Sequence, residues 1–330
     1  GWNSFVDVAA AMHVHRSDKC TILNPVVGGE PIAGSSRMKG GSATLVILDV
    51  LCMRSLFLAG LIPRDHRLHD LSSRSVLEIM CEYQRVHASV YSVCGKSLPM
   101  LMGAAAGALR GGGRVYYIGL GAAAVVGGID LSEMPDTYGA PFDQMRSFVH
   151  SGWDAFRNVE GDISDVSHLH RIGLDQFESH ILPLVTERDF VLCLVSSCQP
   201  IDPAALRELH RVASAVSAAA PGCVGLVHTT CSSPSSVHQS TTVTPLINGI
   251  ANMCGDLYAV TKLPYGGGFS DFAVKLMVNA ISTYAQAAGR GKLPILLFTM
   301  YVVYITKCHY HCNYYRRCLQ VAHDLHWACE

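Results

Sequence analysis

The sequence predicts an α/β protein with a doubly wound parallel sheet flanked by helices. Short runs rich in β-branched and aromatic residues, which are typical of strands, occur at 114–119, 190–197 and 223–228. A helical stretch at 203–220 separates the last two runs, which gives the strand–helix–strand order of parallel sheets. A Gly/Ala loop and an apolar helical stretch follow the first run, as they do where a parallel α/β domain begins.

Further helices are predicted where apolar residues recur at helical spacing. These stretches lie at 44–61, 72–91 and 272–288. Inside the second stretch, Ser75 and Glu78 have the spacing of a capping box. The Ser/Thr-rich stretch 232–244 instead suits a surface loop.

The composition restricts the class of protein. The 330 residues are 49% hydrophobic and 15% charged, which predicts a compact globular protein of one or two domains. A formal charge of -1 gives no positive field for phosphate backbones, so we expect no nucleic-acid partner. The apolar stretch 293–305 is shorter than the roughly 20 residues of a spanning helix, so we interpret it as core and expect no membrane partner.

The cysteines indicate a reducing compartment. There are 13 of them, an odd number spread over a long chain, and the start of the chain has neither a basic nor an apolar signal region. We therefore expect an intracellular protein, cytoplasmic or nuclear. The Cys/His cluster at 308–318 lacks a second matching pair, so we predict no metal site.

The segment Gly34–Ser42 reads Gly-Ser-Ser-Arg-Met-Lys-Gly-Gly-Ser and directly precedes a predicted helix. A phosphate monoester needs several converging donors with little side-chain bulk, which a Gly/Ser loop at a helix N-terminus offers. The candidate ligands are Gly34, Ser35, Ser36 and Ser42, with Arg37 and Lys39 as cations. Two alternatives remain: the run only caps the helix, and the two cations are solvated loop charges.

Three segments of the chain resemble the sugar isomerase (SIS) family of phosphosugar-binding domains. Residues 24–44 are similar to its signature Asn-Pro-x-x-Gly-x-Glu…Gly-Ser-Ser-Arg-Met-Lys-Gly-Gly-Ser-Ala-Thr. Residues 121–139 are similar to a second motif containing Gly-x-x-Asp-x-Ser-Glu, and residues 276–292 to a shared helix with Asn-x-x-Ser-Thr. Within the family, the chain resembles the glucokinase regulatory proteins and the N-acetylmuramic acid 6-phosphate etherases.

The resemblance implies a domain organisation. Glucokinase regulatory proteins have two tandem SIS domains and a helical lid, whereas the etherases have one SIS domain per chain and dimerise. The tandem arrangement implies the end of a first SIS domain at 1–62, a linker helix at 63–100, a second SIS domain at 101–292 and the start of a lid at 293–330. It also implies that the first phosphate loop lies upstream of Gly1.

The resemblance further implies a regulatory binding protein, not an enzyme, without a cofactor. Its ligand would be fructose 6-phosphate or a related sugar phosphate, and it would inhibit a glucokinase or hexokinase partner. Gly34–Ser42 would form one wall of the sugar-phosphate site, and Glu133 would contribute to that site or be vestigial. Glu30 also matches a family position, with a structural role at the helix and a sugar contact both open.

The loop 119–124 lies where open α/β sheets bind ligands. The hydroxyl residues of the etherase motif are Ala122 and Ala123 here, and its next glycine is Ala124. We therefore expect a packed turn, with weak anion binding by backbone amides as the alternative.

An etherase-like lyase is the competing function. That chemistry needs carboxyl groups as acid and base near the sugar, and Glu133 and Glu160 match the two positions. The alanine loop argues against it, as does the segment 265–269, which stands where another Gly-Ser-x-Arg-Met-Lys would be expected. A degenerate product with no working site is the third alternative.

Overall fold

The computed structural model describes residues 35–64, 66, 68–157, 159–231 and 242–289, together with Leu23, Val27, Glu30 and Ile32. Gly34, most of the expected surface loop, the apolar stretch 293–305 and the Cys/His cluster therefore lie outside the described residues. The elements in chain order are α2 (Lys39–Leu58), α3 (His69–Ser72), α4 (Val76–Val93), α5 (Ser97–Arg110), β1 (Val115–Gly119), α6 (Gly121–Ser132), α7 (Met134–Tyr138), β2 (Met145–Val149), η1 (Gly152–Phe156), η2 (His168–His170), α8 (Leu174–His180), η3 (Leu182–Leu184), β3 (Phe190–Ser196), α9 (Pro203–Ala219), β4 (Val224–Cys231), α10 (Val243–Cys254), β5 (Tyr258–Leu263) and α11 (Gly268–Gly289).

The five strands form one parallel sheet in the order β2-β1-β3-β4-β5. The chain leaves β1 for β2 on one side and then crosses back to β3 on the other, so the strand order reverses at β1. All five residues of β1 are buried, as in strands that are covered on both faces. Gly119 ends this strand so close to β3 that a Cβ there would lie 2.5 Å from the Leu194 carbonyl oxygen.

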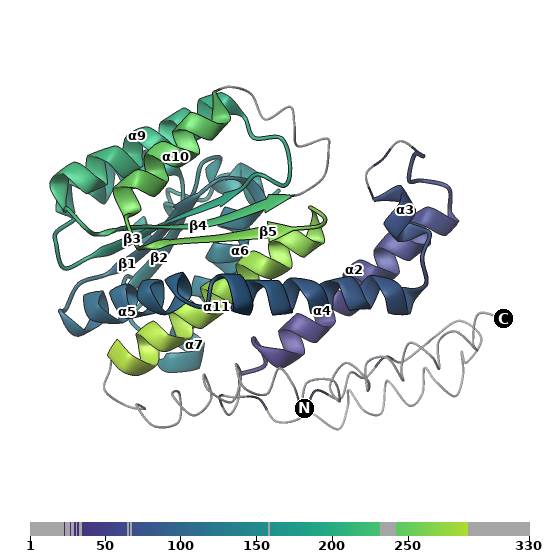
Figure 1. Cartoon of the computed structure of the whole chain (residues 1–330). Coiled ribbons are helices and arrows are strands. Elements are labelled where there is room, and N and C mark those ends of the chain that lie inside the picture. Colours follow the sequence, from purple (N-terminus) through teal and green to yellow (C-terminus); the bar gives the residue numbers. More distant parts are fainter. Residues whose placement is uncertain are drawn as a thin grey trace.

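Helices cover both faces of the sheet. Figure 1 shows α9 and α10 on one face and α5 and α11 on the other. The first pair packs on β1, β3 and β4 in one hydrophobic core, together with α8. On the other face, α4, α5, α6 and α11 share a second core with the same strands. The predicted doubly wound α/β fold is therefore confirmed.

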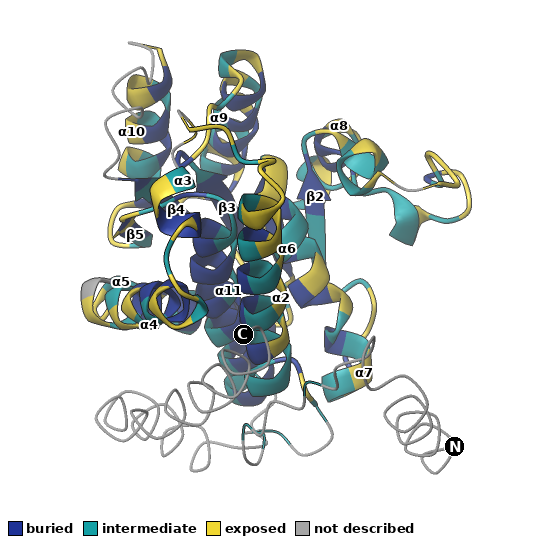
Figure 2. Ribbon diagram, turned by 90° about the vertical axis from the view of Figure 1, so that its right-hand side faces the viewer, coloured by how far each residue is buried: buried dark blue, intermediate teal, exposed yellow. Residues whose placement is uncertain are grey.

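Helix α2 packs against α4 and α11 with only part of its apolar surface. Val46, Val50 and Met53 are buried, whereas Leu56 and Leu58 are 46% and 69% exposed. In Figure 2 this helix lies at the front of the molecule, with exposed positions along it. It is the one described helix that is long and apolar enough to cross a membrane, a test that core helices of soluble proteins also pass.

The structure differs from the sequence-based expectations in several elements. Strands β2 and β5 and helices α5 and α10 were not predicted. The two strands are short, α5 is rich in Gly and Ala, and α10 contains Pro245 and Gly249, which are typical of loops. Helix α2 begins five residues before the expected start, since its first turn includes the Gly-Gly pair. The capping box of α4 is confirmed: Ser75 Oγ accepts from the Glu78 amide at 3.3 Å, and the Glu78 carboxylate accepts from the Ser75 amide at 2.9 Å.

Candidate functional site

The N-terminus of α2 is capped by a carboxylate from earlier in the chain. The amides of Lys39 and Gly40 donate to the two carboxylate oxygens of Glu30, at 3.0 and 2.6 Å. A negative charge in this position satisfies two of the amides that a helix start leaves open and lies at the positive end of the helix dipole. Of the two roles that the sequence left open for Glu30, the structure contains the one at the helix.

The next two amides also have acceptors within the segment. The Gly41 amide donates to the Ser36 carbonyl at 2.7 Å, and the Ser42 amide donates to the Met38 carbonyl at 3.3 Å. The sequence suggested that these amides would be free for a phosphate, but the structure gives all four to the protein. In this conformation, these four amides are occupied, so the side-chain hydroxyls of the segment become the main candidate donors to a ligand.

Arg37 points into the interior, where its side chain is 2% exposed. Its Nη2 lies 2.7 Å from Asp130 Oδ1 and 2.7 Å from Ser282 Oγ. Asn279 Oδ1 at 3.2 Å and Thr283 Oγ1 at 3.4 Å are further acceptors around the same nitrogen, which has two hydrogens to share. The three segments that carry the SIS resemblance thus meet at one guanidinium, since Asp130 comes from α6 and the other acceptors from α11.

The ion pair between Arg37 and Asp130 is buried without full hydrogen bonding. Burial raises the pKa of the Asp130 carboxyl, and the nearby guanidinium and the Ser282 hydroxyl partly offset that rise. Within the described part of the chain, Arg37 Nε and Asp130 Oδ2 have no hydrogen-bond partner. Arg37 therefore anchors the Gly/Ser segment to α6 and α11. Its predicted contact with a sugar phosphate stays a prediction, and this geometry weighs against it.

Lys275 is a second buried cation beneath the segment, and sequence reasoning missed it. Its Nζ donates to the Arg37 carbonyl at 2.7 Å and to Ser42 Oγ at 3.2 Å. Burial lowers the pKa of Lys275 to about 8, and Arg37 adds to this effect, whereas Asp130, Glu133 and Glu30 oppose it. A lysine inside the otherwise apolar pattern of the predicted helix at 272–288 was the available signal.

The other residues that were predicted to contact the phosphate are more accessible than Arg37. Ser36 is exposed, while Ser35 and Lys39 are half-buried. Ser42 is half-buried in the first turn of α2, with its hydroxyl engaged by Lys275. The wall therefore combines an exposed serine with an anchored backbone.

The two candidate catalytic carboxyl groups are in different surroundings. Glu133 follows α6, is half-buried, and raises the pKa of Lys275 through its charge. Glu160 is exposed in the loop between η1 and η2. The structure thus places Glu133 near the buried cations and Glu160 on an exposed loop.

The loop 119–124 leads from β1 into α6, and no side chain caps the start of this helix. Gly121 has a φ of 54° and is exposed together with Ala122, whereas Ala123 and Ala124 are buried against the sheet. Within the described ranges, no group of three or more His, Cys, Asp and Glu side chains could hold a metal ion.

The comparisons with known proteins bear on the part of the chain that forms the sheet. Residues 91–285 match the family model described as glucokinase regulatory protein, second SIS domain. The chain is 36% identical over 196 residues to glucokinase regulatory protein from Xenopus laevis, an alignment that covers 59% of this chain and 30% of the relative. It is 29% identical over 296 residues to the protein of the same name from Rattus norvegicus, covering 86% of this chain and 44% of the relative.

A more distant similarity extends to enzymes. Over 105 residues, the chain is 35% identical to N-acetylmuramic acid 6-phosphate etherase from Gloeobacter violaceus, covering 31% of this chain and 34% of the relative. The chain spans less than half the length of the glucokinase regulatory proteins named above. Because the second-SIS-domain model matches more than half of the chain, the chain belongs to the glucokinase regulatory protein family.

Proposed function

We propose that this chain is part of a regulatory protein that binds fructose 6-phosphate or a related sugar phosphate and inhibits a glucokinase-type kinase inside the cell. The observation that carries the proposal is the anchored segment before α2. Arg37 fixes this segment to α6 and α11 from below, while Ser36 stays exposed above. A loop that is held in place before its ligand arrives loses little freedom on binding, which favours affinity.

Within this site, the residues have different roles. Ser35, Ser36 and Ser42 supply hydroxyl groups to the phosphate, and Gly34 leaves room for it because it has no side chain. Lys39, half-buried at the start of α2, supplies the positive charge. Arg37 acts chiefly by positioning the wall. Glu133, whose charge raises the pKa of Lys275, contributes to the sugar side of the site. The names of the relatives from Xenopus and rat support the regulatory role and the kinase partner.

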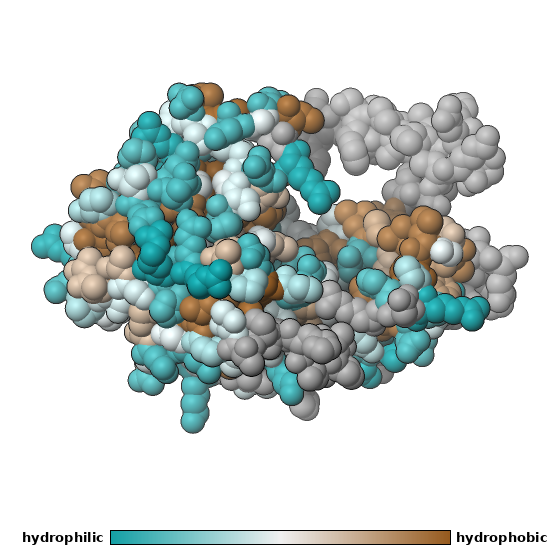
Figure 3. All heavy atoms as spheres, turned by 90° about the horizontal axis from the view of Figure 1, so that it is seen from above, coloured by the Kyte–Doolittle hydropathy of each residue, from teal (hydrophilic) through white to brown (hydrophobic). Residues whose placement is uncertain are grey.

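We further propose that α2 belongs to a first SIS domain, that the helices up to residue 100 link it to the second, and that a lid begins at 293. The exposed leucines near the end of α2 support the first assignment, because an apolar helix face is normally covered. Figure 3 shows hydrophobic atoms gathered in that part of the molecule, which lies on the right in Figure 1.

Calorimetry with fructose 6-phosphate on the full-length parent protein tests the site. We expect Ser36→Ala to weaken binding about three- to tenfold, the effect of one lost hydrogen bond. Ser151→Ala, at another exposed serine, is the matched control and should leave binding unchanged. Equal affinity of Ser36→Ala and the wild type would remove the segment from the site.

The lyase remains the competing function because the chain is also similar to proteins named as etherases, and Glu133 matches an acid position in the motif of that family. An assay for lactate release from N-acetylmuramic acid 6-phosphate distinguishes the two functions. If the protein is a regulator without catalytic activity, we expect no release of lactate. Release that Glu133→Ala abolishes would establish the lyase instead.

A further inference from the structure

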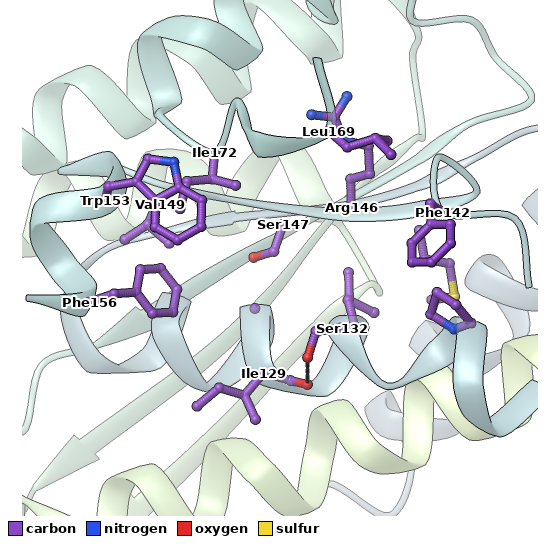
Figure 4. A pocket seen from close by; sticks show the side chains of 14 residues that line it. Ile129, Ser132, Phe142, Arg146, Ser147, Val149, Trp153, Phe156, Leu169 and Ile172 are labelled. Carbon is purple, nitrogen blue, oxygen red and sulfur yellow. Dashed lines mark hydrogen bonds between the residues drawn. The ribbon is translucent and has the colours of Figure 1, made fainter. Parts of the chain in front are cut away.

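A cavity of about 310 Å³ lies between α6, the edge strand β2 and the loops that carry η1 and η2 (Figure 4). No residue of the segment before α2 lines it, so it is separate from the proposed sugar-phosphate wall. Its volume is at the lower end of the range of about 300–1,000 Å³ that is usual for small-molecule sites.

Two aromatic rings form the wall of the cavity that η1 contributes. Trp153 and Phe156 lie with their ring centroids 5.9 Å apart and tilted by 50°. The indole N–H of Trp153 donates to the His170 carbonyl at 2.8 Å, so its polar atom already has a partner. This wall therefore offers ring surfaces, which favour a flat apolar ligand.

The cavity has one charged lining residue, and the charged end of that residue is held by the η2 loop. Among the lining residues, Arg146 is the one with an ionisable side chain. Its Nη2 donates to the carbonyls of His168 and Arg171, at 2.8 and 2.9 Å, and its Cζ lies 4.9 Å from the ring centroid of Phe148. In Figure 4 the guanidinium extends toward Leu169 and away from Ser147, so the lining around Ser147 is uncharged and suits an uncharged ligand.

One hydroxyl in the cavity is unsatisfied. Ser147 Oγ on β2 is buried and has no hydrogen-bond partner among the residues that the structure describes. Figure 4 shows it between β2 and α6, facing the cavity. Ser132, which also lines the cavity, differs because its Oγ donates to the Ile129 carbonyl at 2.8 Å. Buried hydroxyls normally have partners, so Ser147 is the polar group that a ligand would satisfy.

A glycine keeps the cavity open opposite Ser147. A Cβ at Gly128 of α6 would lie 3.8 Å from Ser147 Oγ and 3.4 Å from Phe156 Cζ. Any larger side chain at this position would extend into the space between the serine and the aromatic rings.

We propose that this cavity binds a small uncharged ligand with a flat apolar body and one polar group, which forms a hydrogen bond with Ser147. The size of the cavity, its aromatic wall, the uncharged lining around Ser147 and the unsatisfied hydroxyl all favour this class of ligand over a charged metabolite. The site does not depend on the proposed binding of a sugar phosphate.

Fluorine NMR titration of the full chain with para-fluorophenol and with fluorobenzene tests the proposal, because the two probes share a ring and differ in the hydroxyl. We expect saturable binding of both, with para-fluorophenol about three- to tenfold tighter. Ser147→Ala should abolish that difference, whereas Ser132→Ala should preserve it.

A second pair of variants tests the location. Gly128→Leu should abolish binding of both probes, while Gly107→Leu, at an exposed helical glycine with no heavy atom within 4 Å of its Cβ, should leave it unchanged. Circular dichroism of each variant verifies folding. Equal affinity of the two probes for the wild type, or binding that survives Gly128→Leu, would overturn the proposal. So would self-association that Gly128→Leu prevents, because the cavity would then be an interface between copies.

Discussion

Helices α2 and α6 both have glycines in their first turn, but their N-termini are built differently. The first amides of α2 are satisfied by Glu30, and its preceding loop is fixed by the buried side chain of Arg37. Helix α6 begins at Gly121 without a side-chain cap and with Ala122 exposed. Of these two helix starts with glycines, one is anchored by side chains from elsewhere in the chain and the other has no side-chain cap.

The two helices are also connected. Asp130, the partner of Arg37, lies on α6, so the helix with the bare start supports the loop before the other helix. The difference shows that a Gly-rich loop becomes a defined wall through side chains from distant segments. Helix α6 thus supports the α2 wall through Asp130, in addition to packing on the sheet and on α11.

The largest expected effect comes from removing the anchor. Arg37→Met leaves the Asp130 carboxyl buried without its cation, and we expect the free energy of unfolding to fall by about 3–5 kcal/mol. Urea unfolding followed by circular dichroism measures this loss. Pairing the substitution with Asp130→Leu should recover much of it, because the second change removes the unpaired charge.

Arg207→Met is the matched control, since Arg207 is an exposed arginine on α9. It should change the free energy of unfolding by less than about 0.5 kcal/mol. If Arg37→Met were equally mild, the contrast between the anchored and the bare helix start would lose its basis.

The next largest effect is a pH dependence of the free energy of unfolding, caused by Lys275 beneath the start of α2. The folded-state pKa of Lys275 is about 8, below the ordinary lysine value of 10.5, so between these values the unfolded chain binds more protons than the folded chain. Stability contributed by this group therefore rises with pH across that window, by on the order of 3 kcal/mol in total. Comparing urea unfolding of the wild type and Lys275→Met on both sides of the window isolates this term from other titrating groups.

A constant difference in the free energy of unfolding between wild type and Lys275→Met across the window would contradict this prediction. The Asp130, Glu133 and Glu30 carboxylates oppose the lowered pKa. Glu133→Gln should therefore move the rise in stability to lower pH, because it removes one negative charge near Lys275.

A smaller effect is expected at the cap of α2. Glu30→Ala removes the acceptor of two helix amides and makes this helix start as bare as that of α6. We expect a loss of about 1–2 kcal/mol in the free energy of unfolding. Glu187→Ala, at an exposed glutamate, should leave the urea midpoint unchanged. A neutral Glu30→Ala would show that the cap is dispensable.

The sequence predicted the fold well where patterns are local. Strands β1, β3 and β4 were identified by their β-branched runs, and the start of α4 by Ser75 and Glu78. Strand β5 was missed because its six residues are followed by a Gly-rich turn and resemble loop sequence. The order of the strands in the sheet depends on packing of the whole chain, which local patterns do not contain.

The candidate site was predictable only in part. The Gly/Ser segment was visible as a motif, but the direction of the Arg37 side chain was not, because its acceptors lie 93 to 246 positions away. The resemblance to the SIS family had identified all three segments, but it did not show that they meet at the Arg37 side chain. Lys275 carried a weak signal as a charge in an apolar helix pattern, and the cavity beside β2 carried none.

The smallest expected effect concerns the bare start of α6. Ala122→Ser restores one hydroxyl that the etherase motif has at this loop, at an exposed position that tolerates it. We expect less than about 0.5 kcal/mol of change in the free energy of unfolding. Affinity for inorganic phosphate, measured by calorimetry, should rise no more than about twofold, because a single exposed hydroxyl gains at most one weak hydrogen bond. A tenfold rise would mean that α6 lost only its side chains, and that its N-terminus is as well prepared for an anion as the anchored wall of α2.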